Sequence, residues 1–155
     1  MTRKIKISES DLYNIIKQVL VEQEEEKVIK FSPSEFESFM LIKKHDKFVN
    51  ALNINYNEVV VSGSLYLVEM TSITSLPNNL YVAGTLNLFK TPIRSLPNNL
   101  YVSGRLDLEQ TLITSLPDNL VVKDEILIHG TPLNDNDELV EEYEAKGYKI
   151  NRDAY

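Results

Sequence analysis

The middle of the chain repeats with a period of 20 residues, and this repeat restricts the fold more than any other feature. Ser75-Leu-Pro-Asn-Asn-Leu80 returns as Ser95-Leu-Pro-Asn-Asn-Leu100 and again as Ser115-Leu-Pro-Asp-Asn-Leu120. The segments between these copies also align, and Val61-Ser-Gly-Ser-Leu-Tyr-Leu67 precedes them. A period of this length is typical of stacked repeats, in which each turn of the chain contacts mainly its neighbours. We therefore expect about four stacked turns between residues 59 and 133.

Alternating apolar residues predict a short strand in each turn. Leu86 and Leu88 are separated by one residue, and the same pattern recurs in every copy. Successive side chains of a strand point to opposite faces, so both leucines should face inward and the residue between them outward. Stacking of the copies then gives a parallel sheet, and Ile93 and Leu96 supply inward side chains on the return path.

Turn-forming residues occupy fixed places in the repeat. Pro97 fixes a turn where no sheet ladder is available, and Asn98-Asn99 tolerate the left-handed conformations that can follow it. A glycine recurs just before each strand, where we expect a tight bend; the positions are Gly63, Gly84 and Gly104.

A threonine recurs just past each strand, at Thr71, Thr91, Thr111 and Thr131. A buried hydroxyl there can satisfy backbone groups left open as the chain turns away from the sheet. We interpret the four residues as a threonine ladder. The alternative is that they only favour extended backbone.

These residues resemble the leucine-rich repeats, in which L-x-x-L-x-L-x-x-N-x-L is followed, in short bacterial forms, by a leucine-proline pair. Leu86-x-Leu88-x-x-Thr91-x-Ile93 with Leu96-Pro97 follows that pattern. The resemblance implies an α+β repeat protein, a parallel β-solenoid with helical caps, that binds a protein partner through its exposed strand face.

Two departures from the family pattern leave an alternative open. Threonine replaces the asparagine of the family, and Ala83 or Ser103 stands where its first leucine would be. A related β-solenoid with a second strand around Leu80 to Val82 is therefore an alternative to a horseshoe.

Patterns outside the repeat predict helices. We divide the chain into an amphipathic helix (residues 1–22), an acidic linker (23–31), an N-terminal helical cap (32–58), the solenoid (59–133) and a C-terminal helical cap (134–155). Capping helices shield the apolar ends and the open sheet edges of a stacked repeat.

The amphipathic N-terminal helix begins at a capping box, Ser8-Glu-Ser-Asp11. It either packs on the solenoid or docks on another molecule, and the acidic run behind it favours docking. Its apolar stripe consists of Leu12, Ile15, Ile16, Val19 and Leu20.

The two caps have signals of their own. Ser32-Pro33-x-Glu35 combines a capping residue, a first-turn proline and a reciprocal glutamate, and Phe36 is the first apolar position after it. Beyond Leu133 the predicted closing helix ends at Gly147, before an extended segment. Its apolar face consists of Leu139, Val140 and Tyr143, and the extended segment contains Tyr148 and Ile150.

The outward positions of the predicted strands vary between copies whereas the inward positions do not. This is typical of a recognition surface, although unconstrained surface positions vary too. Apolar side chains on adjacent turns favour a protein partner. The predicted partner-binding face consists of Tyr66, Val68, Asn87, Phe89, Arg105, Asp107, Glu109, Leu127 and His129.

Composition and motifs argue against other functions. A formal charge of −7 repels phosphate backbones, so we expect no nucleic-acid partner. No apolar segment approaches the roughly 20 residues that span a bilayer, so we expect no membrane partner. The absence of cysteine removes thiolate catalysis, including that of the ubiquitin-ligase domains that accompany similar repeats in some bacterial effectors.

Other catalytic sites are equally unsupported. No phosphate loop, nucleophile motif or metal-ligand spacing is present. A carbohydrate-processing enzyme would need more carboxylates on one face than Asp107, Glu109 and Glu125. We expect neither an enzyme nor a bound metal or cofactor.

The sequence thus predicts a protein-binding module in the cytoplasm of a bacterium or an infected host cell. The alternative is a phage-encoded virion or head-associated structural protein. Leu20-Val-Glu22 resembles the sites at which prohead proteases of large tailed phages remove short capsid-targeting helices, and it lies at the end of such a helix. In that case cleavage follows Glu22 and the helix is a targeting segment.

Overall fold

The computed structural model of the protein describes residues 28–37 and 58–153, which form two parallel five-stranded sheets with few helices. The predicted amphipathic helix, Glu22 and most of the acidic linker lie outside the described residues, as does the larger part of the predicted N-terminal cap.

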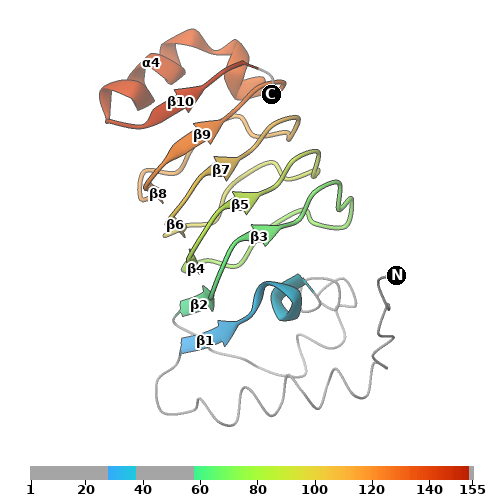
Figure 1. Cartoon of the computed structure of the whole chain (residues 1–155). Helices are drawn as coiled ribbons and strands as arrows, with labels where there is room; N and C mark the ends of the chain where they lie inside the picture. Colours follow the sequence, from blue (N-terminus) through green and yellow to red (C-terminus); the bar gives the residue numbers. More distant parts are fainter. Residues whose placement is uncertain (1–27, 38–57, 154–155) are drawn as a thin grey trace.

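From β2 to β9, successive strands alternate between the two sheets, so that neighbours within a sheet come from consecutive repeats (Figure 1). Sheet A contains, in spatial order, β1 (Val28–Phe31), β2 (Glu58–Val61), β4 (Leu80–Val82), β6 (Tyr101–Val102) and β8 (Val121–Val122). Sheet B contains β10 (Lys149–Asn151), β9 (Glu125–Leu127), β7 (Leu106–Asp107), β5 (Leu86–Asn87) and β3 (Leu65–Tyr66). The second strand suggested around Leu80 to Val82 is present as β4.

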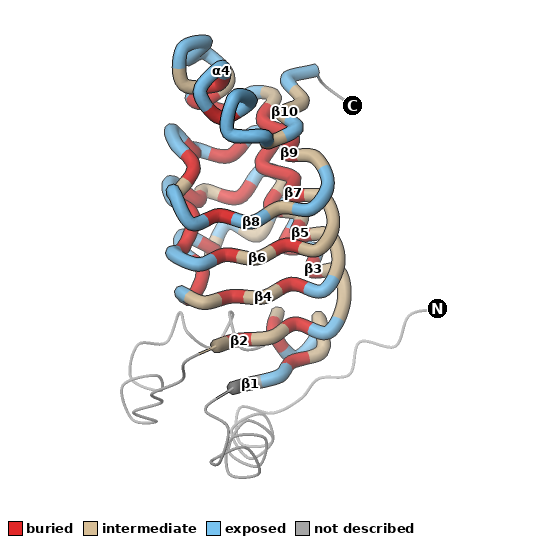
Figure 2. Tube along the Cα trace, turned by 90° about the vertical axis from the view of Figure 1, so that its left-hand side faces the viewer, coloured by how far each residue is buried: buried red, intermediate tan, exposed pale blue. Residues whose placement is uncertain are grey.

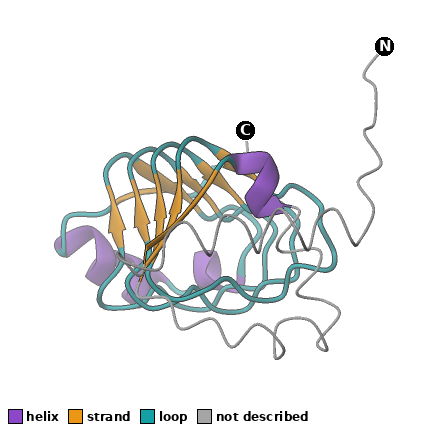
Figure 3. Ribbon diagram, turned by 90° about the horizontal axis from the view of Figure 1, so that it is seen from below, coloured by secondary structure: helices purple, strands orange, loops and turns teal. Residues whose placement is uncertain are grey.

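The core lies between the two sheets and the loops that complete each turn. Figure 3, a view along the stack, shows the strands on one part of the outline and loops on the rest. Leu86 and Leu88 are fully buried, as their alternation predicted, and Ile93 is fully buried on the return path. The equivalent leucines, isoleucines and valines of the other turns join the same apolar cluster.

The first turn of the repeat contains one residue more than the two turns that follow it. Leu65 pairs with Leu86, 21 positions later, whereas Leu86 pairs with Leu106, 20 positions later. The extra residue places Met70 where later turns have threonine, because the Met70 and Thr91 amides donate to the equivalent carbonyls of Leu67 and Leu88.

The threonine prediction is confirmed in three turns and wrong in one. Thr91, Thr111 and Thr131 are buried, and each hydroxyl donates to the carbonyl three residues earlier, at 2.8, 2.7 and 2.7 Å. Thr71 is exposed because the extra residue moves it past this site. The bonds lie within one turn, so these threonines close each turn instead of linking neighbouring turns.

Asparagines of the loops link neighbouring turns through their side chains. Asn99 donates from Nδ2 to Asn79 Oδ1 at 2.7 Å, and Asn119 donates in the same way to Asn99 at 2.6 Å. Asn79 and Asn99 have φ of +57°, so the predicted left-handed conformation is confirmed for both.

Close packing requires a glycine at the bend before β5. The predicted bends are present at Gly63, Gly84 and Gly104, but none of these residues has a positive φ, so a left-handed backbone does not explain the glycines. A Cβ at Gly84 would lie 2.4 Å from Ser64 Oγ and 2.8 Å from Ser64 N. Consecutive turns approach this closely where the chain passes from sheet A to sheet B.

At the N-terminal end, a strand replaces part of the predicted linker. Val28–Phe31 forms β1, which pairs in parallel with β2 over four residues and so extends sheet A by one strand. The predicted capping box is present on the helix over residues 33–37. The Ser32 hydroxyl donates to Glu35 Oε2 at 2.6 Å and the Ser32 amide donates to the same oxygen at 2.8 Å. These two bonds lower the pKa of Glu35. Phe36 is fully buried and contacts Phe31 edge-on.

At the C-terminal end, a short helix, a longer helix and a strand follow the last repeat. η1 (Pro132–Asp135) leads into α4 (Asp137–Ala145), with Asn136 as its N-cap. Gly147 has a φ of +96° and ends the helix as predicted, and β10 is the predicted extended segment. β10 pairs with β9 and so adds a fifth strand to sheet B.

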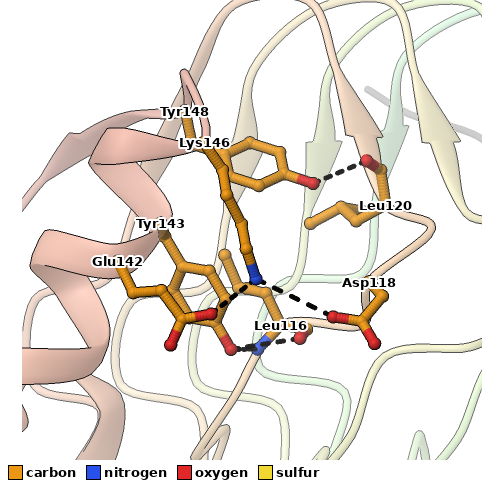
Figure 4. Close-up of polar contacts among 7 residues, drawn as sticks. All are labelled: Leu116, Asp118, Leu120, Glu142, Tyr143, Lys146 and Tyr148. Atoms are coloured by element: carbon orange, nitrogen blue, oxygen red, sulfur yellow. Dashed lines mark hydrogen bonds and ion pairs between the residues drawn. The ribbon is translucent and has the colours of Figure 1, made fainter.

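Two tyrosines of this closing segment bind the backbone of the last repeat (Figure 4). The Tyr143 hydroxyl accepts from the Leu116 amide at 2.9 Å and donates to the Leu116 carbonyl at 3.1 Å. The Tyr148 hydroxyl donates to the Leu120 carbonyl at 2.7 Å.

Candidate protein-binding face

The outward side of sheet B brings most of the predicted site residues together. Strand pairing aligns one outward residue from each strand in a single column, which we call the sheet B column: Tyr66, Asn87, Asp107, Leu127 and Asn151. Val68, Phe89, Glu109 and His129 follow the strands, and Arg105 precedes one of them. The predicted face is therefore one surface, but its two ends differ.

The end formed by the first two turns exposes apolar side chains. Tyr66 is 56% exposed and Val68 is 42% exposed, and Phe89 on the next turn is half-buried. Lys90 Nζ lies 4.9 Å from the centre of the Phe89 ring and 3.0 Å from Glu69 Oε1. We call Tyr66, Val68 and Phe89 the apolar end.

Side chains in the middle of the sheet B column bond to the backbone and to one another. Asn87 Nδ2 donates to Asp107 Oδ2 at 2.8 Å. Asn87 Oδ1 accepts from the Phe89 amide at 2.9 Å, and Asp107 Oδ1 accepts from the Glu109 amide at 3.0 Å. Asn151 repeats this turn with the Asp153 amide. Each of these side chains accepts from the amide two residues later, which turns the chain and ends the strand.

Three of the nine predicted face residues are buried, so the expectation that they are available at the surface is wrong. Asp107 is 7% exposed, Glu109 is 6% exposed and Leu127 is 2% exposed. β10 places Asn151 beside Leu127, and the hydrogen bonds hold Asp107 against Asn87. The extended segment was expected from the sequence, but its pairing as the last strand of sheet B was not.

The polar residues of the face are engaged in structural contacts. Burial raises the pKa of Asp107, against the lowering effects of the Glu109 amide, the Arg105 charge and Asn87. Arg105 forms an ion pair with Glu125 at 2.7 Å, and His129 Nδ1 lies 3.3 Å from the Arg152 carbonyl. Among the described residues, no group of three or more histidines and carboxylates is placed to hold a metal ion.

An open depression of about 700 Å³ lies beside this face, between β9 and the segment around β10. Charged groups of both signs line it, including Glu125, Lys149 and Arg152. It holds little apolar surface, so it does not have the chemistry of a typical small-molecule pocket.

No protein-family model, curated protein or solved structure matches this chain. In the part of the chain that the structure describes, no helix is long and apolar enough to cross a membrane.

Sequence reasoning missed a second surface, on the outside of sheet A. Tyr81 and Tyr101 stack there with ring centres 4.7 Å apart and ring planes 13° apart. The signal was present, because each tyrosine follows the last leucine of a Ser-Leu-Pro-Asn-Asn-Leu copy and precedes an inward valine. It was not used because the second strand around Leu80 to Val82 was only an alternative, and the candidate residues came from the strands around Leu86 and its equivalents.

Proposed function

We propose that the chain is a non-enzymatic protein-binding module, a leucine-rich-repeat-like β-solenoid whose apolar end contacts the partner. The observation that carries this proposal is the exposure of Tyr66 and Val68 on a turn whose backbone is hydrogen-bonded to the backbone of the next turn. The Leu67 amide donates to the Asn87 carbonyl at 2.8 Å, and the Glu69 amide donates to the Phe89 carbonyl at 2.8 Å. Large apolar side chains on a rigid platform are typical of interfaces.

The repeating arrangement supports the solenoid part of the proposal. Both sheets grow by one strand per repeat, and hydrogen bonds from strands and from Asn99 and Asn119 join neighbouring turns. Each turn alone orders about 20 residues around a few aliphatic side chains, so stability has to come from contacts between turns.

The side chains of the apolar end are large enough to contribute most of the binding energy of an interface. Truncation of a well-packed interface anchor costs about 2 kcal/mol or more, which corresponds to roughly 30-fold in affinity. Tyr66 makes no hydrogen bond with any residue that the structure describes, so its hydroxyl is available to a partner. Aromatic residues with a polar tip are enriched at protein interfaces for this reason.

The test is quantitative capture of proteins from the native source, with the full chain and with Tyr66→Ala/Val68→Ala. The expected result is loss of a specific partner by about 10-fold or more with an unchanged melting temperature. Leu112→Ala is the matched control, because Leu112 is 37% exposed and lies outside both the sheet B face and the outer face of sheet A. Equal capture by the two variants would refute the proposal.

The second candidate function, a virion or head-associated structural protein, is favoured by Leu20-Val-Glu22 at the end of the predicted amphipathic helix. It predicts that protein recovered from purified particles begins at Gln23. Peptide mapping of the first residues by mass spectrometry distinguishes the two. Chains that keep Leu12 to Leu20, or that are missing from the particles, count against this role.

A further inference from the structure

An apolar stripe crosses the outer face of sheet A. Strand pairing aligns Val60, Tyr81, Tyr101 and Val121 on four consecutive strands, and we call these four residues the sheet A stripe. Val121 is 37% exposed and the other three are half-buried. Figure 2 shows this face, with the strands stacked from β1 to β8. The stripe is separate from the sheet B face.

The geometry of the tyrosines restricts what can bind there. Their ring faces are turned toward each other, and Lys123 Nζ lies 5.7 Å from the Tyr101 ring centre. Ser103 Oγ donates to the Tyr81 hydroxyl at 3.1 Å. One face of each ring is covered by the other ring, so a sugar or base cannot stack between the two tyrosines. Ring edges and valine methyl groups instead form a ridge suited to the aliphatic side chains of an amphipathic helix.

We propose that this ridge binds the chain's own N-terminal segment, with the apolar stripe from Leu12 to Leu20 packed on it. The lengths agree. As a helix, Leu12 to Leu20 extends about 12 Å, at 1.5 Å per residue. Val60 to Val121 spans three strand spacings of about 4.8 Å, or about 14 Å.

The connection allows this contact in one orientation. The segment joins sheet A directly, because β1 is its edge strand and begins at Val28. Residues 21–27 can span up to about 23 Å, which is enough for the chain to reverse over β1. Leu20 then lies near Val60, and Leu12 lies near Val121 at the far end of the stripe.

Charge favours the same orientation. Glu9 and Asp11 precede Leu12 and fall beside the exposed Lys123, which follows β8. Exposed ion pairs contribute little to affinity, but they discriminate between orientations. A second copy of the chain, or another protein's helix, would meet the same ridge, and the test separates these occupants from the cis segment.

The chain has no cysteine, so two introduced thiols report on a single contact. The full chain carrying Leu12→Cys with Val121→Cys is compared with Leu12→Cys with Leu112→Cys, since residues 121 and 112 are equally exposed. Under mild oxidation of dilute protein, the first pair is expected to form its intramolecular disulfide at least 10-fold faster. Equal rates, or disulfides found only between two chains, overturn the proposal.

Proteolysis tests the contact without introduced cysteines. Val121→Glu places a charge in the sheet A stripe, and trypsin is then expected to cut after Lys17 several-fold faster than in the unmodified chain. Leu112→Glu is the control and should leave the rate unchanged. Unchanged cleavage in Val121→Glu overturns the proposal. Capture through Tyr66 and Val68 is independent of either result, so this inference can fail while the proposed function stands.

Discussion

Single side chains close each turn of the stack, and the threonines are the clearest example. The Thr111 hydroxyl is buried and donates to Leu108 O, a carbonyl at the point where the chain leaves β7. The same contact occurs one turn earlier and one turn later. In the first turn, Met70 occupies the position and the hydroxyl is missing. The first turn therefore lacks one of the hydrogen bonds that stabilise the others.

Thr111→Val is expected to lower the free energy of unfolding by about 1 kcal/mol, because the shape is kept while the buried Leu108 carbonyl loses the hydroxyl and keeps only the amide of residue 111. Urea denaturation measures this difference. Thr71→Val is the control at the exposed, displaced position and should stay within about 0.5 kcal/mol of the unmodified chain. Similar losses in both variants would mean that threonine acts only through its preference for extended backbone.

Asp107 makes the stability of the protein depend on pH. Because burial raises its pKa in the folded state, folding favours the protonated form. This stabilisation is present below the usual aspartate pKa of about 3.9 and is lost as the pH rises through the higher folded-state value. The stability of Asp107→Asn relative to the unmodified chain should therefore increase between about pH 3 and pH 6. Chemical denaturation across this pH range measures the difference, and Asp124→Asn at an exposed position is the control. A difference in stability that stayed constant with pH would contradict the argument.

At the scale of the element, the corner between the sheets sets how closely the turns can stack. Gly84→Ala brings a Cβ within 2.8 Å of the Ser64 backbone nitrogen, so the corner has to shift. We expect a loss of about 1–3 kcal/mol, the usual effect of overpacking. Gly63→Ala is the matched control, since its Cβ would lie 3.4 Å from Pro33 Cγ, an ordinary contact. Chemical denaturation of both variants tests this, and equal stabilities would show that the corner can expand at no cost.

The elements could be predicted from the sequence wherever they follow the period of the repeat. Leu86 and Leu88 marked the strand, and Ser32-Pro33-x-Glu35 marked the helix start, because these signals are local. β1 was missed because a lone strand of four residues next to an acidic run has no repeat to identify it. The burial of Leu127 was missed because it depends on β10, which comes from a distant part of the sequence and pairs through its backbone.

At the scale of the whole molecule, the ends of the stack need different chemistry from its middle. Inside the stack, the Leu100 carbonyl accepts from the Val121 amide of the next turn, at 2.9 Å. After the last turn no such amide follows, and the Tyr148 hydroxyl donates to the equivalent Leu120 carbonyl instead. Tyr143 in addition binds both backbone groups of Leu116 (Figure 4). The Tyr148 hydroxyl thus replaces a hydrogen bond that the amide of a further repeat would supply.

This replacement predicts where the stack opens first when its closing contacts are weakened. Tyr143→Phe/Tyr148→Phe leaves the buried backbone groups of Leu116 and Leu120 without these partners, at about 1–3 kcal/mol for each site. Because stacked turns are coupled mainly to their neighbours, the last turn should open locally before the others. Amide hydrogen exchange should therefore accelerate at Leu116 and Leu120 while the Leu86 amide, two turns away, stays protected. Tyr66→Phe, which removes an exposed hydroxyl, is the control, and uniform acceleration along the chain would show that the stack opens only as one unit.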